Sequence, residues 1–146
     1  MDKKQIILEG KKVLKIELES IKTLNSSFNE KFYKIIDVLF KTQGRVIVTG
    51  IGKSGHIAKK ISATLSSTGT PSQFVHPSEA SHGDLGNITN NDCILAFSNS
   101  GQSNELKDII NYAKRFSVPI LSISSNKKSF LSQKSNYALI FKKPNE

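Results

Sequence analysis

The second half of the sequence alternates short apolar runs with segments of helical periodicity, and this alternation constrains the fold more than any other feature. The runs are nearly continuous in Val, Ile, Leu, Ala and Phe, which is typical of strands buried on both faces by helices. The sequence therefore predicts an α/β domain with a doubly wound, mostly parallel, five-stranded sheet flanked by helices. The predicted strands cover residues 46–49, 73–76, 93–97, 119–123 and 137–141.

Helices are predicted both before and within this alternation. Residues 4–24 carry apolar side chains at helical spacing beside a Lys/Glu face, and a capping box of Ser27 and Glu30 predicts a second leading helix. Residues 77–91 are rich in Ser, Asn, Gly and Asp, which predicts an irregular loop. Neither a repeat nor a linker divides the chain, so we expect one domain over residues 1–146. The remaining predicted helices cover residues 55–68, 103–116 and 128–134.

The composition is that of an ordinary globular domain. Apolar residues make up 37% and charged residues 23% of the 146 residues. No apolar run reaches the roughly 18–20 residues that span a bilayer, and the amino terminus lacks the apolar core and cleavage site of a signal peptide. We therefore expect a cytoplasmic protein with no membrane partner. The lone cysteine, Cys93, lies in an apolar run, which predicts a buried, inert thiol.

The formal net charge of +9 raises the alternative of a nucleic-acid partner. Nearly all of this charge is lysine, and only Arg45 and Arg115 could make bidentate contacts with bases or phosphates. The lysines are scattered along the chain without interleaved aromatic residues. We therefore expect no nucleic-acid partner, and the charge favours an anionic small molecule.

Ligands of parallel sheets bind at the carboxyl ends of the strands, so the segments that follow the apolar runs are the candidate site. The first is Gly50–Gly55, which matches the dinucleotide pattern G-x-G-x-x-G. A dinucleotide fold also needs an acid at the tip of the second strand, where this sequence has His76. A glycine-framed helix start that favours an anion remains, with Lys53 as a mobile cation and Ser54 as a further donor. A nicotinamide-dependent oxidoreductase stays as an alternative.

The second candidate segment is Ser98–Glu105, which joins a predicted buried strand to a helix. Its hydroxyls, together with free backbone N–H groups at a helix start, would cradle a phosphate without any positive side chain. The alternative is a serine-rich turn with ordinary helix capping. The candidate phosphate ligands are Ser98, Ser100 and Ser103.

Between these two segments, two histidines and two acids fall within nine residues, His76 to Asp84. Histidine and carboxylate are common zinc ligands, but the spacing matches no compact zinc pattern. Polar contacts of the histidines with sugar hydroxyls are the favoured interpretation, and a metal bound in this loop is the alternative.

Together these segments resemble the sugar isomerase (SIS) domain of the arabinose-5-phosphate isomerases. The resemblance runs in register from the leading helix to the last residue, and the His-Pro-x-Glu-Ala-x-His-Gly-Asp-Leu stretch is specific to this family within the SIS superfamily. The matching segments are Gly50–His56, Ser67–Pro71, His76–Leu85 and Ser98–Gly101.

The resemblance implies interconversion of D-ribulose 5-phosphate and D-arabinose 5-phosphate, a step that feeds synthesis of the lipopolysaccharide sugar Kdo. It also implies a cytoplasmic homotetramer with active sites at subunit interfaces, with no cofactor required. His76 matches a family zinc position. By motif, the catalytic positions are Lys53, Glu105 and Glu146, and the substrate contacts are Gly69, Thr70, His76 and His82, with the three serines binding phosphate.

In the family, the chain continues beyond the glutamate that matches Glu146 into a Ser/Thr-rich loop, another helix and a further catalytic histidine, and many relatives add two CBS domains. We therefore expect residues 1–146 to form a phosphosugar-binding SIS domain that is C-terminally incomplete relative to the family. A non-catalytic phosphosugar sensor and an inactive remnant are the alternatives to an isomerase.

An aldose–ketose isomerisation moves a proton between C1 and C2 through an enediol. It needs a base, a group that stabilises the developing oxyanion, and an anchor for the phosphate. Glu105 and Glu146 are both candidates for the base. Lys53 is expected to stabilise the enediolate or steer the phosphate, and His76 and His82 are expected to assist ring opening or hold hydroxyls.

Overall fold

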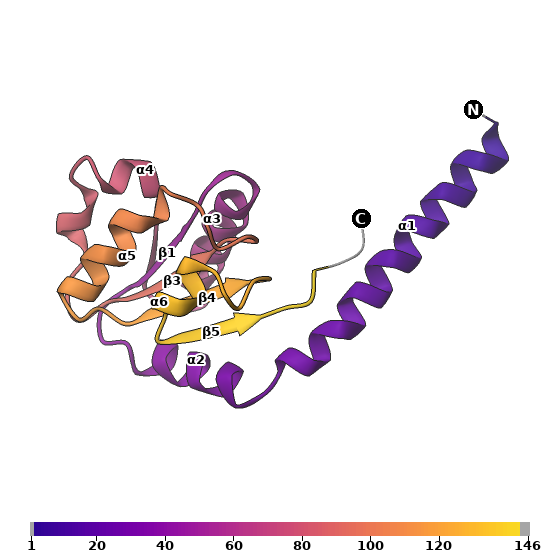
Figure 1. The fold of residues 1–146 in the computed structure, drawn as a ribbon. Helices are drawn as coiled ribbons and strands as arrows, with labels where there is room; N and C mark the ends of the chain where they lie inside the picture. Colours follow the sequence, from indigo (N-terminus) through magenta and orange to yellow (C-terminus); the bar gives the residue numbers. More distant parts are fainter. Residues whose placement is uncertain (1, 144–146) are drawn as a thin grey trace.

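The sheet is the centre of the computed structural model, which describes residues 2–143. Its five strands are all parallel and lie in the order β2-β1-β3-β4-β5 (Figure 1). Each strand agrees with a predicted apolar run to within one residue at either end, so the predicted sheet is confirmed. The strands are β1 (Val46–Gly50), β2 (Ser72–Val75), β3 (Cys93–Phe97), β4 (Ile120–Ser124) and β5 (Tyr137–Ile140).

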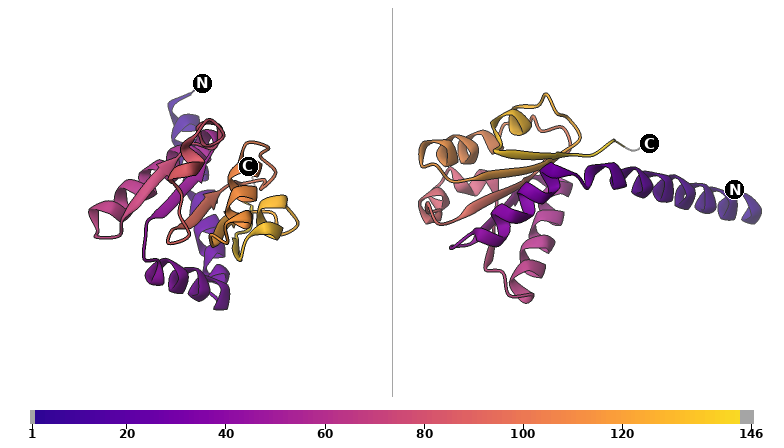
Figure 2. Two further views of the ribbon diagram at one scale, coloured as in Figure 1. Left: turned by 90° about the vertical axis from the view of Figure 1, so that its left-hand side faces the viewer. Right: turned by 90° about the horizontal axis from the view of Figure 1, so that it is seen from below.

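Helices cover both faces of this sheet (Figure 2). Because successive strand residues point to opposite faces, Val48 and Leu95 pack against the side of α2 and α3, whereas Ile47 and Ile94 pack against α5. The doubly wound architecture is therefore confirmed. The helices that flank the sheet are α2 (Glu30–Lys41), α3 (Gly52–Ser67), α4 (Pro77–Ala80), α5 (Leu106–Arg115) and α6 (Phe130–Lys134).

Two local predictions were wrong. Asn29, not Ser27, caps α2, since its side-chain oxygen accepts a hydrogen bond of 2.9 Å from the backbone N–H of Lys31. Ser27 instead lies in a short 3-10 helix, η1 (Leu24–Ser27), and donates to the carbonyl of Ile140. The loop predicted over residues 77–91 contains α4 and a second 3-10 helix, η2 (Asp84–Asn87). Pro77 starts α4 because its fixed φ suits the first helical position.

The leading helix α1 (Lys3–Thr23) extends away from the rest of the molecule (Figures 1 and 2). None of its residues is buried. Among residues 2–143, no helix combines the length and the apolarity needed to cross a bilayer. Cys93, by contrast, is fully buried in β3, and this burial raises the pKa of its thiol, as expected of an inert cysteine.

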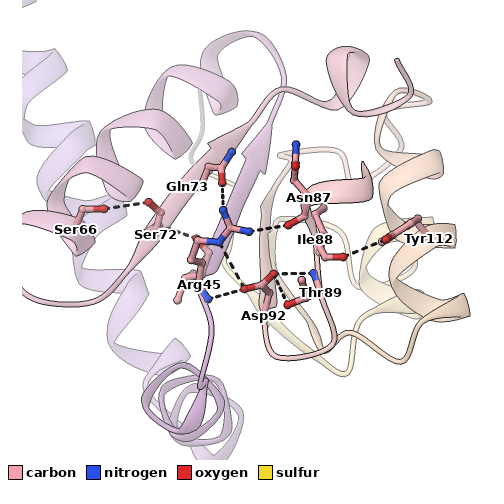
Figure 3. Close-up of polar contacts among 10 residues, drawn as sticks. Arg45, Ser66, Ser72, Gln73, Asn87, Ile88, Thr89, Asp92 and Tyr112 are labelled. Carbon is pink, nitrogen blue, oxygen red and sulfur yellow. Dashed lines mark hydrogen bonds and ion pairs between the residues drawn. The ribbon is translucent and has the colours of Figure 1, made fainter. Parts of the chain in front are cut away.

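A buried carboxylate ties the amino ends of the strands together (Figure 3). Asp92 is 3% exposed and accepts hydrogen bonds from the backbone N–H of Arg45 (2.6 Å) and of Thr89 (2.8 Å), and from the Thr89 hydroxyl (3.0 Å). The Arg45 guanidinium donates in turn to Gln73 and to the carbonyl of Asn87. Burial alone raises the pKa of Asp92, but these hydrogen bonds and the Arg45 charge lower it by more, so the pKa lies below its ordinary value.

We expect Asp92→Asn to lower the free energy of unfolding by about 2 kcal/mol at pH 7, because the buried N–H groups lose a charged acceptor. A lowered pKa in the folded state stabilises the protein above the unfolded-state value of about 3.9, and this contribution disappears as pH falls through the folded pKa. Urea titrations between pH 3 and pH 7 should therefore show a smaller acid loss in Asp92→Asn than in the parent. An unchanged pH dependence would contradict this role.

Candidate phosphate-binding site

The candidate site lies where the order of the strands reverses. From β1 the chain crosses to β2 through α3 on one face, and from β3 it crosses to β4 through α5 on the other face. The two connections diverge from the carboxyl ends of β1 and β3, which is the position at which doubly wound sheets bind ligands. Gly50 pairs with Phe97 at the end of both strands, so the two predicted loops start side by side.

The serine turn, residues 98–105, follows β3 directly. The Ser98 hydroxyl is buried, accepts a hydrogen bond of 3.0 Å from the backbone N–H of Gly101 and lies 3.2 Å from the Ser103 hydroxyl. Ser100 is exposed, and its oxygen accepts from the backbone N–H of Gln102 at 3.2 Å. Ser98 and Ser100 therefore use their oxygens to shape the turn, and the Ser100 proton remains available to a ligand.

Backbone donors complete this turn. Within residues 2–143, the N–H groups of Ser103, Asn104 and Glu105 have no acceptor, and α5 begins at the next residue. Unpaired N–H groups at a helix amino terminus bind anions, helped by the helix dipole. Glu105 is exposed and occupies the N-cap position without a side-chain capping bond. The predicted helix starts at residue 103 and would place Glu105 in its first turn, whereas α5 starts one residue after Glu105. Among residues 2–143, the carboxylate has no hydrogen-bond partner and can make another contact.

The turn rests on the segment that follows β4, which sequence reasoning missed. The carbonyl of Asn99 accepts hydrogen bonds from the hydroxyls of Ser124 (3.2 Å) and Ser125 (2.8 Å). Gly101 has a φ of 66°, and a Cβ atom there would overlap the Oγ atom of the fully buried Ser129. Polar residues directly after the fourth apolar run were the signal that could have revealed this support.

The glycine turn after β1 lies next to the serine turn. A Cβ on Gly55 would lie 2.7 Å from the carbonyl oxygen of Gly50, and Gly52 has a φ of 57°. Close packing and a left-handed turn therefore account for the glycine pattern without a dinucleotide. Lys53 is exposed and Ser54 is half-buried, both in the first turn of α3. Both side chains therefore belong to the turn that starts beside the serine turn.

His76 follows β2, the strand on the other side of β1. It borders a hollow of about 290 Å³ between α3 and β2. Sequence reasoning missed His56 and Lys59 in this hollow, although their spacing of three residues places both on one face of α3. The hollow is lined by Gly52, Gly55, His56, Lys59, Phe74 and His76.

The described residues do not fit zinc. The Nδ1 atom of His76 accepts a hydrogen bond of 3.3 Å from the backbone N–H of Ser78 as the cap of α4, so the neutral ring carries its proton on Nε2 and acts as a donor. A zinc-bound histidine needs the opposite arrangement, with the nitrogen that does not bind the metal donating. Within residues 2–143, no three histidine, cysteine or acidic side chains form a group that could hold a metal.

The remaining predicted site residues do not all lie near the serine turn. Ser81, beside His82, donates a hydrogen bond of 2.6 Å to Asp108 in the first turn of α5, which keeps the exposed His82 near the amino end of that helix. Gly69 and Thr70 lie at the amino ends of the strands, opposite the end that carries the serine turn, because α3 leads the chain back to the start of β1, where the carbonyl of Pro71 accepts from the backbone N–H of Val46. Glu146 lies outside the described residues.

A doubly wound parallel sheet with unpaired N–H groups beside its switch point is typical of phosphate-binding α/β domains. A family model described as SIS domain matches residues 39–146, and the chain belongs to this family. The solved structure of E. coli CFT073 c3406 in complex with arabinose 5-phosphate agrees with the whole chain at a TM-score of 0.93 and 34% identity, covering 78% of that protein. The model match begins near the end of α2, so α1 precedes it.

Curated relatives include the protein named arabinose 5-phosphate isomerase KdsD from Yersinia pestis. It is 47% identical over 94% of this chain and 42% of its own length. The protein of the same name from Francisella tularensis is 47% identical over 86% of this chain and 39% of its own. The chain thus spans about two fifths of the length of the curated relatives it matches.

Gly101→Ala should destabilise the domain by about 2–3 kcal/mol, because alanine disfavours the positive φ and its methyl group would overlap Ser129. Gly86→Ala is the matched control, since an added Cβ there meets nothing and the change should stay within about 0.5 kcal/mol. Urea denaturation measures both. Equal, small effects would show that the serine turn does not rest on Ser129.

Proposed function

We propose that this chain is the sugar-phosphate-binding domain of an aldose–ketose isomerase that interconverts D-ribulose 5-phosphate and D-arabinose 5-phosphate. The observation that carries the proposal is the serine turn at the carboxyl end of β3, which has backbone N–H groups without an acceptor among residues 2–143 and an exposed Ser100 hydroxyl. The names of the two KdsD relatives and the bound sugar phosphate of the E. coli CFT073 structure support the choice of sugar. The proposal includes a cytoplasmic location and a role in supplying the precursor of Kdo.

The phosphate is bound first in this mechanism. The backbone N–H groups of residues 103–105 and the hydroxyls of Ser100 and Ser103 donate to its oxygens, and Ser54 approaches from the neighbouring turn. A fixed phosphate holds the sugar carbons in one position relative to the serine turn, which removes most of the entropic cost of aligning them with a base.

Proton transfer follows at the other end of the sugar. Glu105 lies at the junction of the serine turn and α5, with no capping bond to occupy its carboxylate, so it can accept the proton from C1 or C2. Glu146 remains the second candidate for this base. The ammonium group of Lys53 stabilises the negative charge that develops on the enediolate oxygen. His76, with its proton on Nε2, donates to a sugar hydroxyl during ring opening.

Gly69 and Thr70 can contribute only if the site is shared. They lie at the amino ends of the strands, whereas the serine turn lies at the carboxyl end of β3. One copy therefore cannot bring these two residues and its own serine turn to a single sugar. The proposal therefore requires that a second copy of the chain supplies Gly69 and Thr70, in line with the homo-oligomer, a tetramer, that the family resemblance implies. No zinc takes part in the proposed reaction, because His76 serves as the cap of α4.

Binding of D-arabinose 5-phosphate to this chain tests the proposal directly by calorimetry. We expect measurable binding of the phosphosugar but none of arabinose, and Ser103→Ala should weaken binding by about tenfold through the loss of one donor to a charged group. Ser26→Ala, exposed on η1, is the control and should bind normally. Equal affinity for arabinose, or no loss in Ser103→Ala, would contradict the phosphate cradle.

Glu105→Gln tests the base in an active protein that contains residues 1–146. We expect kcat to fall by about 10²–10⁴-fold while KM changes little, because the amide keeps the shape of the side chain but cannot accept the proton. The measurement is exchange of the substrate C–H proton with deuterated water. Glu30→Gln, exposed at the start of α2, is the control. Exchange at the parent rate would leave Glu146 as the candidate.

A further inference from the structure

None of the apolar side chains of α1 is buried against residues 2–143. At 100° per residue, most of them fall in one arc of roughly 140°, and the lysines fall mainly on the other side. Ile7, Leu14 and Ile21 are each at least half exposed. The arc carries Ile6, Ile7, Val13, Leu14, Leu18 and Ile21.

The total exposed area of the chain is also larger than that of a compact monomer of the same mass. The chain exposes 9455 Å² for a mass of 16.1 kDa. A compact monomer of this mass exposes about 7,400 Å², so the excess is about 2,000 Å². A stable protein–protein interface buries about 800 Å² on each partner. The excess is more than the area that one partner buries in a stable interface, and α1, which has no buried residue, contributes to it.

The arc is also complementary to itself. Gly10 lies near its middle, and a Cβ added there would meet no atom within 4 Å. If two copies of α1 cross antiparallel at Gly10, then Ile6 lies opposite Leu14, and Ile7 lies opposite Val13. The two charged residues of the arc meet as well, because Lys3 of one copy lies opposite Glu17 of the other.

We propose that α1 pairs antiparallel with α1 of a second copy of this chain, about a two-fold axis near Gly10. A two-fold axis brings the same patch of both copies together, which is the arrangement that a self-complementary arc allows. Glycine lets the two backbones approach closely at the crossing, which gives a reason for a residue that weakens an isolated helix. The proposal rests on α1 alone and is independent of the isomerase function.

An anionic membrane is the other surface that a lysine-rich amphipathic helix could contact. Glu17 argues against it, because its position within the apolar arc would bring a carboxylate to the negatively charged lipid headgroups. Between two copies, the same carboxylate faces Lys3. The second copy is therefore the occupant that the sequence of α1 fits.

Light scattering after size exclusion tests the pairing on the 146-residue chain. We expect the parent to form particles of two chains or a multiple of two, and Leu14→Glu to halve the particle mass while circular dichroism still reports the folded α/β domain. Leu8→Glu is the matched control, because Leu8 is 65% exposed on the lysine side of the same helix. Its particle mass should equal that of the parent.

The charge pair tests the antiparallel direction. Lys3→Glu and Glu17→Lys should each raise the dissociation constant of the pair about tenfold, since each variant places like charges opposite one another, and the double variant should restore it. A monomeric parent, an unchanged mass in Leu14→Glu, or an equal loss in Leu8→Glu would overturn the proposal. A monomeric parent that sediments with phosphatidylserine vesicles would assign α1 to a membrane surface instead.

Discussion

The parallel pairing of β1 with β3 is the constraint on which the rest of this structure depends. Their last residues, Gly50 and Phe97, are in register, so two turns leave the sheet at one level and diverge to opposite faces. The approach is close, because a Cβ on Gly50 would lie 3.0 Å from the carbonyl oxygens of both Phe97 and Ser54. A side chain at this position would press the glycine turn away from the end of β3, and the chemistry of the site follows from the proximity of the glycine turn to the serine turn.

Most of this arrangement could be predicted from the sequence, since strands buried on both faces are continuous apolar runs and their ends are marked by glycine and serine. The order of the strands, however, depends on contacts between distant residues. Asp92 illustrates this, because it binds Arg45, 47 positions earlier, and nothing in its local sequence identifies it as the residue that ties the strands together. Local patterns predict elements well and long-range polar contacts poorly.

The wrong predictions have the same physical origin. Ser27 and Glu30 have the spacing of a capping box, but Ser27 is drawn to the carbonyl of Ile140, 113 residues away, and Asn29 takes over the cap. The polar residues after β4 signal that this segment has a polar partner, but they do not identify Gly101 as that partner, because a hydroxyl in one turn decides which residue is allowed in another. His76 differs from these residues, because its capping bond joins neighbours in the sequence. This bond occupies Nδ1 and leaves Nε2 as the ring nitrogen that can donate.

The distance between the two ends of the strands links the proposed reaction to the association of copies of the chain. The 16 residues of α3 span about 24 Å, so Gly69 and Thr70 lie much further from the serine turn than a pentose phosphate can reach. If these two residues and the serine turn contact the same sugar, the sugar must lie between two copies. The copies then need a pairing element that leaves the serine turn uncovered, and α1 meets that condition, because none of its residues is buried in its own copy. The helix that contributes least to the fold of one chain is thus the part best suited to join two.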